Sequence, residues 1–462
     1  MLSNPSHAAA NSLKAAMDSG SSIGSWTRVM PVAAAILLKG DLMMMELVRT
    51  YALSGATVID GHGGAPLNDT TVLVDNGVIK AVGSRESIIV EDYITEIDVG
   101  GHFILPGLID AHVHIVGVAS PKLLDNIVES KYLQAMRTVV EAGKLLEYGF
   151  TTIRSGGSRY DIFLKRAIEE GTVIGPRILT CGLALCRSRG HGDSIRRDIY
   201  EFPENFVKDN LPKAQLVDGV EEVRKAVRQL IGQNVDHIKF WATGGGAWEK
   251  ERTTDMHFTR AEMEVIMEEA RMVGLPVMCH AESVESVKIA VDLGVRSIEH
   301  ADDDNGYELD DETCMKMVEK NIFLTPTLAI FYFDLEEDEE DILPSWVRSL
   351  KRAKKHGVKM LLGTDTWADS VTPYGKFNIS EIKLLVDVLE MTPLEAITAA
   401  TKHGAEACGI GDKIGTVEKG KLADLVVVKK DPVSDINVLL DKENVRYVIK
   451  DGKFVVNHPK VI

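Results

Sequence analysis

The feature that most constrains this chain's fold is an alternation of short apolar runs with helix-length amphipathic segments between residues 108 and 365. Short apolar runs are typical of buried strands, and a helix after each one is the pattern of parallel βαβ units. Eight such runs within about 260 residues predict a (β/α)8 TIM-like barrel. The predicted strands are Leu108–His114, Thr151–Ser155, Arg177–Gly182, His237–Thr243, Pro276–Ala281, Ser297–Ala301, Phe323–Leu328 and Met360–Asp365.

The segments between these runs carry the signals of helix ends. Several predicted helices stop at a glycine, the residue that most readily adopts the left-handed cap. A doubly wound sheet is the alternative fold, but no Gly-x-Gly-x-x-Gly follows the first strand. We interpret Gly244–Gly246 as a turn that lets a loop pass close to the site. The predicted helices are Tyr132–Tyr148, Val220–Ile231, Arg260–Val273 and Ser283–Leu293, and the capping glycines are Gly149, Gly274, Gly294 and Gly357.

The two flanking parts of the chain, 46–105 and 416–462, have a different sequence pattern, in which short β-forming runs are broken by Gly, Asn and Asp. Asp75-Asn76-Gly77 is a strong hairpin signal. The Ala- and Ser-rich first 45 or so residues resemble neither region. We expect them to form a flexible tail, a short helix or a leader upstream of the true translation start. The predicted domains are a flexible extension at 1–45, a small β-sandwich built from 46–105 and 416–462, and the barrel at 106–415.

Composition narrows the possible partners and the compartment. The formal net charge of −17 argues against a nucleic-acid partner, because phosphate binding needs a basic face. Acidic runs such as 336–341 are interpreted as a solvated rim, with steering of cationic substrates as the alternative. Five cysteines without a Cys-x-x-Cys pair favour a reduced, cytoplasmic protein. The sequence holds no run of 18 apolar residues, so we expect no membrane span.

Metal-ligating residues recur where the predicted strands end. His112 and His114 are one residue apart on a strand, so their side chains point to the same side. Catalytic groups of a barrel lie at the carboxyl ends of its strands. Imidazole and carboxylate at several such ends predict a metal centre. In chain order the candidate residues are His112, His114, Lys239, His280, His300 and Asp365.

In combination these motifs resemble the amidohydrolase superfamily, over about residues 50–456. Gly190-His-Gly-Asp193 resembles a mark of the branch that holds Xaa-Pro dipeptidase-like enzymes and ochratoxin amidase. Within that branch the chain most resembles the phenylurea and molinate (thiocarbamate) hydrolases. The motifs are Pro106-Gly-Leu-Ile-Asp-Ala-His-Val-His114, Ile238-Lys-Phe240, Cys279-His-Ala-Glu282, Ile298-Glu-His-Ala301 and Leu362-Gly-Thr-Asp365, with 420–428 as a closing segment.

The resemblance implies one or two divalent ions, Zn, Co or Mn. It assigns His112, His114 and Asp365 to one ion and His280 and His300 to the second. Lys239 would bridge both as a carbamate formed with CO2. An unmodified ammonium cannot ligate a cation, so Lys239 would otherwise be an ion-pair partner. A bound cation lowers the pKa of water from 15.7 to roughly 7 and polarises a carbonyl, and Asp365 is then expected to carry the proton to the leaving group.

Candidate substrate-binding residues lie in the predicted loops. His191 is expected to donate a hydrogen bond to the substrate's carbonyl oxygen. Arg187 and Arg189, in the same loop, either contact a substrate carboxylate or carbonyl oxygen or form surface ion pairs. Aromatic residues of the other loops supply apolar walls or simply pack those loops. The further candidates are Trp248, His257 and Phe331.

We therefore expect a metal-dependent hydrolase of a small amide-like carbonyl compound, a thiocarbamate such as molinate or a phenylurea. A dipeptidase or N-acyl amino acid amidohydrolase of the same branch is the first alternative. The second is a non-catalytic oligomeric scaffold, against which the six intact positions argue. Relatives of this branch are commonly oligomeric, so we expect a homo-oligomer.

Overall fold

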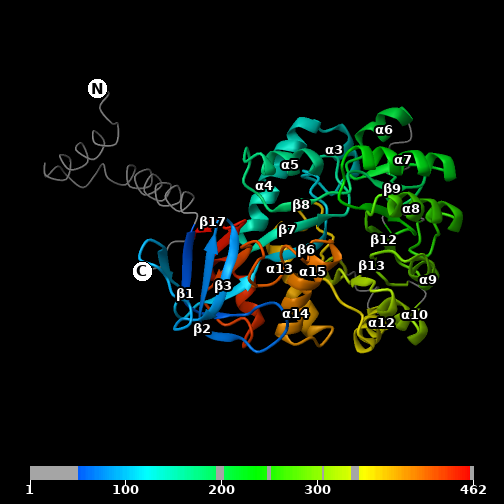
Figure 1. The fold of residues 1–462 in the computed structure, drawn as a ribbon. Helices are drawn as coiled ribbons and strands as arrows, with labels where there is room; N and C mark the ends of the chain where they lie inside the picture. The colour runs from blue at the N-terminus through cyan, green and yellow to red at the C-terminus, as the bar shows by residue number, and fades with distance from the viewer. Residues whose placement is uncertain (1–49, 194–201, 247–250, 304–305, 334–342, 458–462) are drawn as a thin grey trace, which may run out of the picture. The chain divides into compact units, whose positions relative to one another are not determined.

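The computed structural model describes residues 50–193, 202–246, 251–303, 306–333 and 343–457. These residues belong to one compact unit that begins at Arg49. The fold is mixed α/β, with parallel strands in the middle of the chain (Figure 1). The predicted extension 1–45 and Trp248 lie outside the described residues. No helix of the described ranges is long and apolar enough to cross a membrane.

Strands from both ends of the described chain form one mixed sheet. Its order is β17-β16-β15-β5-β1-β2-β3, and β4 pairs with β1. The two ends meet where β5 pairs antiparallel with β15, with Pro106 opposite Leu425. The sandwich form and the boundaries 46–105 and 416–462 stay predictions. The strands are β1 (Thr50–Val58), β2 (Leu67–Asp75), β3 (Val78–Ser84), β4 (Thr95–Asp98), β5 (Phe103–Pro106), β15 (Leu425–Val428), β16 (Val445–Lys450) and β17 (Lys453–Asn457).

The predicted hairpin is confirmed at its turn. Asn76 and Gly77 connect β2 to β3 with φ of 49° and 82°. Positive φ at both central residues is the geometry of a type I′ turn, which matches the twist of the paired strands.

The middle of the chain supplies parallel strands in two sheets, of order β6-β7-β8 and β10-β9-β11-β12-β13-β14. Seven of the eight predicted strands are present there. The sequence did not predict β9 and β10. The strands are β6 (Leu108–Val113), β7 (Phe150–Ser155), β8 (Arg177–Leu179), β9 (Ala184–Cys186), β10 (Ala214–Leu216), β11 (Ile238–Trp241), β12 (Val277–Ala281), β13 (Ser297–His300) and β14 (Phe323–Thr325).

The eighth predicted strand, Met360–Asp365, is not a regular strand. The segment forms single bridges, from Met360 to β14 and from Thr366 to β6. Asp365 has a φ of 55°, which no extended strand can accommodate. The segment still donates backbone hydrogen bonds to both neighbours, from Leu361 to Leu324 and from Thr364 to His112. The closed barrel stays a prediction.

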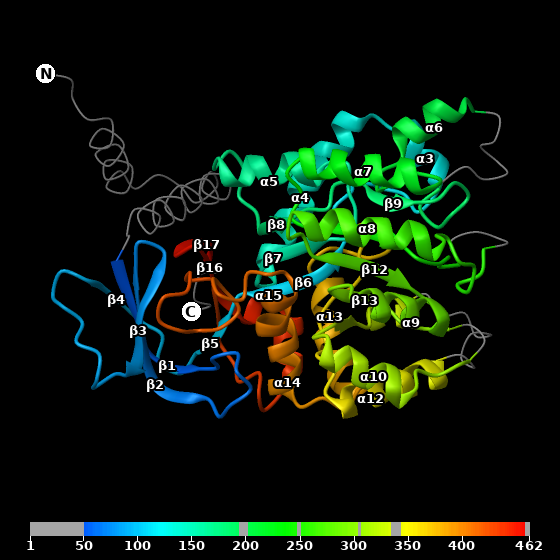
Figure 2. The ribbon, with the colours of Figure 1, turned by 45° about the vertical axis from the view of Figure 1, so that its right-hand side comes forward.

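Helices follow most of these strands, and Figure 2 shows α7, α8 and α9 beside the strands they connect. Each of the four predicted capping glycines has a positive φ, between 73° and 91°. The helices are α3 (Leu123–Val128), α4 (Lys131–Glu147), α5 (Asp161–Glu169), α6 (Glu204–Asn210), α7 (Val220–Gly232), α8 (Arg260–Met272), α9 (Val284–Leu293), α10 (Asp311–Glu319), α11 (Leu328–Phe333), α12 (Leu343–His356), α13 (Lys376–Asp387), α14 (Pro393–Thr398) and α15 (Gly404–Ala407), with short helical turns at Ala399–His403, Ile436–Leu440 and Lys442–Asn444.

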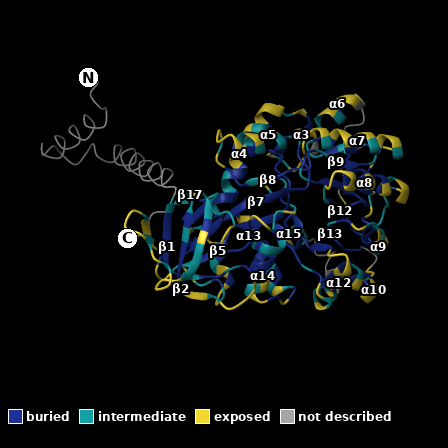
Figure 3. Ribbon diagram, in the orientation of Figure 1, coloured by how far each residue is buried: buried dark blue, intermediate teal, exposed yellow. Residues whose placement is uncertain are grey.

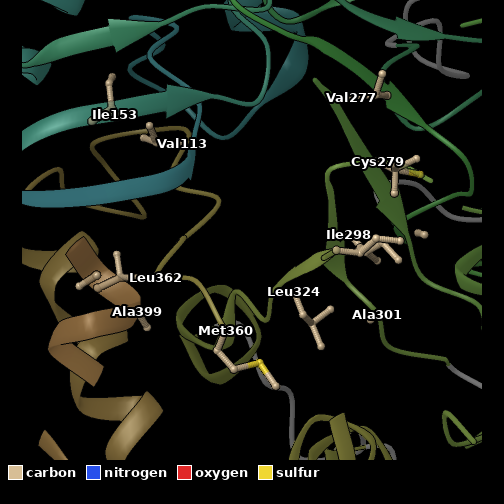
Figure 4. Packing of buried hydrophobic residues seen from close by; sticks show 14 of the residues in the cluster. Val113, Ile153, Val277, Cys279, Ile298, Ala301, Leu324, Met360, Leu362 and Ala399 are labelled. Atoms are coloured by element: carbon tan, nitrogen blue, oxygen red, sulfur yellow. The ribbon is translucent and has the colours of Figure 1, made fainter. Parts of the chain in front are cut away.

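The core lies between the strands and these helices. Figure 3 shows buried strands and exposed residues on the outward sides of the helices. Figure 4 shows side chains from β6, β7, β12, β13 and β14 that belong to the same buried cluster. Cys279 lies in this cluster, as expected for a strand residue that faces away from the site. The packed strands give the polar groups at their carboxyl ends a rigid base.

Candidate metal centre

Four of the predicted ligands lie together at the carboxyl ends of the strands. Oδ1 of Asp365 lies 3.3 Å from Nε2 of His112 and 3.0 Å from Nε2 of His114. Ligand atoms of His112, His300 and Asp365 lie within 4.8 Å of one another. The three histidines are at most 2% exposed, whereas the Asp365 side chain is 22% exposed. The group therefore opens toward solvent on the side of Asp365.

Each histidine has one ring nitrogen bound by the protein. Nδ1 of His114 donates to the Gly157 carbonyl at 2.8 Å. Nδ1 of His112 contacts a Glu299 carboxylate oxygen at 3.2 Å. Nδ1 of His300 donates to Oγ1 of Thr327 at 2.7 Å, since that hydroxyl donates its own hydrogen to Pro326. A nitrogen that donates to the protein leaves the opposite nitrogen with a lone pair for a metal.

The fourth histidine uses the other nitrogen. Nε2 of His280 donates to the Gly244 carbonyl at 2.9 Å, which leaves Nδ1 as the nitrogen with the lone pair. Its ring centroid lies 4.7 Å from that of His300. Glu282, a residue to which the sequence analysis assigned no role, approaches the same Nε2 at 3.6 Å. These contacts fix the orientation of the ring.

Lys239 enters the centre from β11. It is 1% exposed, and its Nζ has no hydrogen-bond partner among the residues that the structure describes. Burial lowers the pKa of its ammonium group, and Glu299 and Asp365 act in the opposite direction. A buried amine without a partner is costly to maintain. Nζ of Lys239 is therefore a buried polar atom that still needs a partner.

The pKa values indicate which charge the centre lacks. Burial lowers the pKa of His112 to about 4 and also holds the pKa of His114 and His300 below the ordinary value. Burial alone would raise the pKa of the Asp365 carboxyl, and positive charge at the positions of His112 and His114 lowers that pKa well below its usual range. At neutral pH two neutral imidazoles thus direct lone pairs at a carboxylate oxygen. A cation between them removes this repulsion, so the donor set fits a divalent metal ion.

Backbone conformation explains how these residues converge. His300 and Asp365 have φ of 73° and 55°, and Thr327, which binds His300, has a φ of 54°. Such values cost free energy in residues other than glycine and are concentrated at functional sites. The turn at His300 also breaks the alternation of β13. Consequently Glu299 and His300 both reach the centre although they are neighbours in sequence.

Glu299 is a buried group of the centre that the sequence analysis missed. Its Oε1 accepts a hydrogen bond from Arg154 at 3.0 Å, and Arg154 also donates to the Ala111 carbonyl at 2.7 Å. Burial would raise the pKa of Glu299, but Arg154 and then His112 hold it below the ordinary value. The only signal in the sequence is the position of Glu299 inside the Ile-Glu-His-Ala motif. Strand alternation predicts the opposite face for it.

Of the predicted loop residues, His191 lies next to the candidate ligand His280, and His257 is connected to His191 through Glu251. The His191 ring stacks on His280 with a centroid distance of 5.1 Å. Glu251 connects the two loop histidines, 3.2 Å from Nδ1 of His191 and 3.5 Å from Nε2 of His257. A Cβ on Gly245 would lie 2.5 Å from the His191 ring, which confirms that the triple glycine permits a close approach of this loop.

The two predicted arginines differ. Nε of Arg187 is buried without a hydrogen-bond partner within the described ranges. Arg189 is exposed, with its backbone N–H bound by Asp193 at 2.7 Å. A cation not predicted from sequence, Lys213, lies over the Trp241 ring at 5.9 Å. That ring is 6.0 Å from His191, so Lys213 belongs to the surroundings of the centre.

Phe331 borders the centre from α11. Its ring meets that of His300 edge-on at 6.1 Å and that of Trp346 at 4.6 Å. Trp346 in turn donates to the His300 carbonyl at 2.9 Å. Phe331 therefore forms an apolar wall beside His300.

Comparison with known proteins identifies the family. The model of the amidohydrolase family matches residues 103–455. This chain therefore belongs to the amidohydrolase family. An ochratoxinase from Aspergillus niger is 29% identical over 420 residues, which cover 84% of this chain and 83% of that protein.

Solved structures agree with this assignment. A prolidase in complex with N-methylphosphonate-L-proline has a TM-score of 0.79 and 31% identity, and covers 88% of this chain and 100% of its own. Phenylurea hydrolase B has a TM-score of 0.75 and 25% identity, with 88% and 96% covered. A molinate hydrolase, with a TM-score of 0.73 and 23% identity over 88% and 94%, resembles this chain in fold.

Proposed function

We propose that this chain is a metal-dependent hydrolase that cleaves the carbonyl C–N bond of a small acyl compound. The observation that supports this most directly is the pair of neutral imidazoles, His112 and His114, directed at the Asp365 carboxylate. We further propose that the parallel strands close into the predicted barrel, since residues 359–366 bond to both β14 and β6.

His112, His114 and Asp365 would hold one ion, and His280 and His300 a second. A divalent ion supplies a Lewis acid for the carbonyl and lowers the pKa of water toward neutrality. Glu299, Gly157, Gly244 and Thr327 would keep each imidazole in the tautomer that offers a lone pair. These contacts engage Nδ1 of His112, His114 and His300 and Nε2 of His280.

Lys239 would join both ions after reaction with CO2. Its neutral amine forms an N–C bond to CO2 and loses one proton, which leaves a carbamate with two ligand oxygens. Burial favours the neutral amine because it lowers the pKa of the Lys239 ammonium. The carbamate on Lys239 would carry its negative charge among residues that can bind cations.

The remaining steps belong to residues at the open side. Asp365 would accept a proton from the attacking water and pass it to the leaving nitrogen. His191, fixed by Glu251 and stacked on His280, would donate a hydrogen bond to the substrate's carbonyl oxygen. Phe331 would exclude water on the His300 side.

Two cations favour a substrate that carries a carboxylate. Arg187 has a buried Nε without a hydrogen-bond partner among the described residues, and Lys213 lies beside Trp241. Carboxylates bind such groups by charge-assisted hydrogen bonds. Of the predicted substrates, this favours an N-acyl amino acid or an Xaa-Pro dipeptide over a neutral phenylurea or thiocarbamate. The ligand of the prolidase relative, an L-proline derivative, agrees.

The test combines metal analysis with a hydrolysis screen. The purified full chain is assayed for Zn, Co and Mn and then offered Xaa-Pro dipeptides, N-acyl amino acids, phenylureas and thiocarbamates. His280→Ala should lower the metal content and abolish hydrolysis, whereas His62→Ala, at the surface, should change neither. Full activity of a metal-free wild type would contradict the proposal.

A further inference from the structure

Over its first three turns, helix α4 has its apolar and polar residues on the opposite sides from those of an ordinary surface helix. Its outward side carries large apolar residues, with Tyr132 82%, Met136 67% and Val140 59% exposed. Its inward side buries the polar residues Gln134 and Thr138 there. We call the outward group the α4 outer face. It consists of Tyr132, Leu133, Met136, Val139 and Val140.

The helices before and after α4 in the chain also expose apolar residues. Val128, at the end of α3, is 55% exposed, and Phe163 on α5 is 70% exposed. Helix α5 packs against α4, and both views of the ribbon show the two side by side (Figures 1 and 2). Single exposed apolar residues are normal on a protein surface, but five of them on successive turns of one helix are typical of an interaction site.

Carboxylates around the α4 outer face are paired within the chain. Arg137 pairs with Glu129, Lys144 with Asp369 at 2.5 Å, and Lys442 with Glu147 at 2.6 Å. Lys131, the first residue of α4, donates to the backbone carbonyl of Asp209. Because these carboxylates are neutralised by cations, they add little to the repulsion between two copies of a chain whose formal charge is −17.

Size complementarity along the helix points to one occupant. Tyr132 and Gly143 are eleven residues apart, about three helical turns, so they lie on the same side of α4. A Cβ on Gly143 would meet no atom within 4 Å. If a second α4 is laid antiparallel on the first, each Tyr132 ring falls over the other copy's Gly143. Met136 then faces Val139 across the two-fold axis.

We propose that a second copy of this chain packs on the α4 outer face, with the two α4 helices antiparallel about a two-fold axis. A stable interface removes about 800 Å² from each partner. The α4 outer face, with Val128 and Phe163, provides apolar area on the order of that amount. A two-fold contact of this kind is self-complementary by symmetry. The proposal gives the expected homo-oligomer a surface and does not depend on the hydrolase activity.

The first test measures the mass of the full chain in solution by analytical ultracentrifugation between 1 and 50 µM, roughly the range of moderately stable dimers. Wild type should be a dimer or an assembly of dimers. Met136→Glu buries a charge in the interface and should halve the mass. The matched control is Met272→Glu, because Met272 is also helical and 64% exposed, close to the 67% of Met136. That control should keep the wild-type mass.

The second test fixes the orientation of the helices. The double variant Tyr132→Cys/Gly143→Cys should form intermolecular disulfides on mild oxidation, whereas either single variant should not. The native cysteines are buried and do not compete. Thermal unfolding and metal content of each variant show whether the fold is retained. A monomeric wild type at 50 µM, an unchanged mass of folded Met136→Glu, or cross-linking of the single variants would overturn the proposal.

Discussion

The metal centre and the α4 outer face both reverse the usual distribution of residues, in opposite directions. The centre buries imidazoles, a lysine and carboxylates that are at most 2% exposed apart from Asp365. The α4 outer face instead exposes five large apolar side chains on one helix. Buried polar groups and exposed apolar patches are the informative departures in a protein structure.

The difference lies in what each region lacks. At the centre every histidine has a protein partner on one nitrogen, and the opposite nitrogens converge on positions that suit a cation. On α4 the missing component is the apolar surface of a partner that would cover the exposed side chains, and no charge is missing there. Electrostatics therefore defines the ligand of the first region, and shape defines the partner of the second. Four substitutions test whether the two regions differ in this way, beginning with the bridging lysine.

Lys239→Ala should have the largest effect. If Lys239 carries the proposed bridging carbamate, its removal should release the second ion and cost several kcal/mol of transition-state stabilisation, about a thousandfold in kcat. Short carboxylic acids such as acetate or propionate should restore part of the rate, because they can occupy the space of the carbamate. Rates and metal content are measured with and without added acid. Wild-type activity in Lys239→Ala would remove the residue from the centre.

Glu299→Gln should weaken metal binding about 10–100-fold, the usual cost of removing a group that orients a ligand histidine. The variant keeps the volume of the side chain and loses the charge that holds Arg154 and His112. Metal affinity is measured by competition with a chelator. Glu308→Gln, a surface carboxylate paired with Arg348, serves as control and should bind metal as wild type does. Equal affinities in both variants would show that His112 needs no carboxylate behind it.

Arg187→Asn should change substrate preference more than metal content. A charge-assisted hydrogen bond contributes roughly 1.5–3 kcal/mol, so kcat/KM for an N-acyl amino acid should fall about tenfold or more. Hydrolysis of the corresponding carboxamide, which has no carboxylate, should change little. The ratio of the two rates is the measurement, and Lys213→Met is tested in parallel. If the acid and the carboxamide lose activity equally, neither cation selects for a carboxylate.

The smallest effect on activity is expected at Glu141, on the inward side of α4. Burial raises the pKa of this carboxyl to about 8. Because the carboxyl has a pKa of 4.5 in the unfolded chain and about 8 in the folded one, raising the pH from 4.5 to 8 increasingly destabilises the folded state. Glu141→Gln should therefore gain on the order of 3 kcal/mol at pH 7 and only a few tenths of a kcal/mol at pH 4.5. Urea unfolding at both pH values tests this, with Glu147→Gln at the helix surface as control.

Much of the fold and most of the centre could be predicted from local patterns. Strand and helix periodicity located β6, β7, β12 and β13, and the glycines at the helix ends marked the caps. The positions of the six candidate residues followed from one rule, that catalytic groups lie at the carboxyl ends of parallel strands, and the family resemblance assigned them to the ions. These features depend on residues close together in sequence, so the sequence alone carries them.

Other features depend on segments far apart in the chain. Arg154 meets Glu299 across 145 residues, and His114 meets Gly157 across 43. The positive φ of His300 and Asp365 reverses the alternation by which sequence assigns faces to strand residues. Residue types and their spacing along the chain therefore indicate which side chains could bind a metal. Which nitrogen of each histidine is available, and which face of α4 is left uncovered, depends on contacts between distant segments, because both follow from long-range packing.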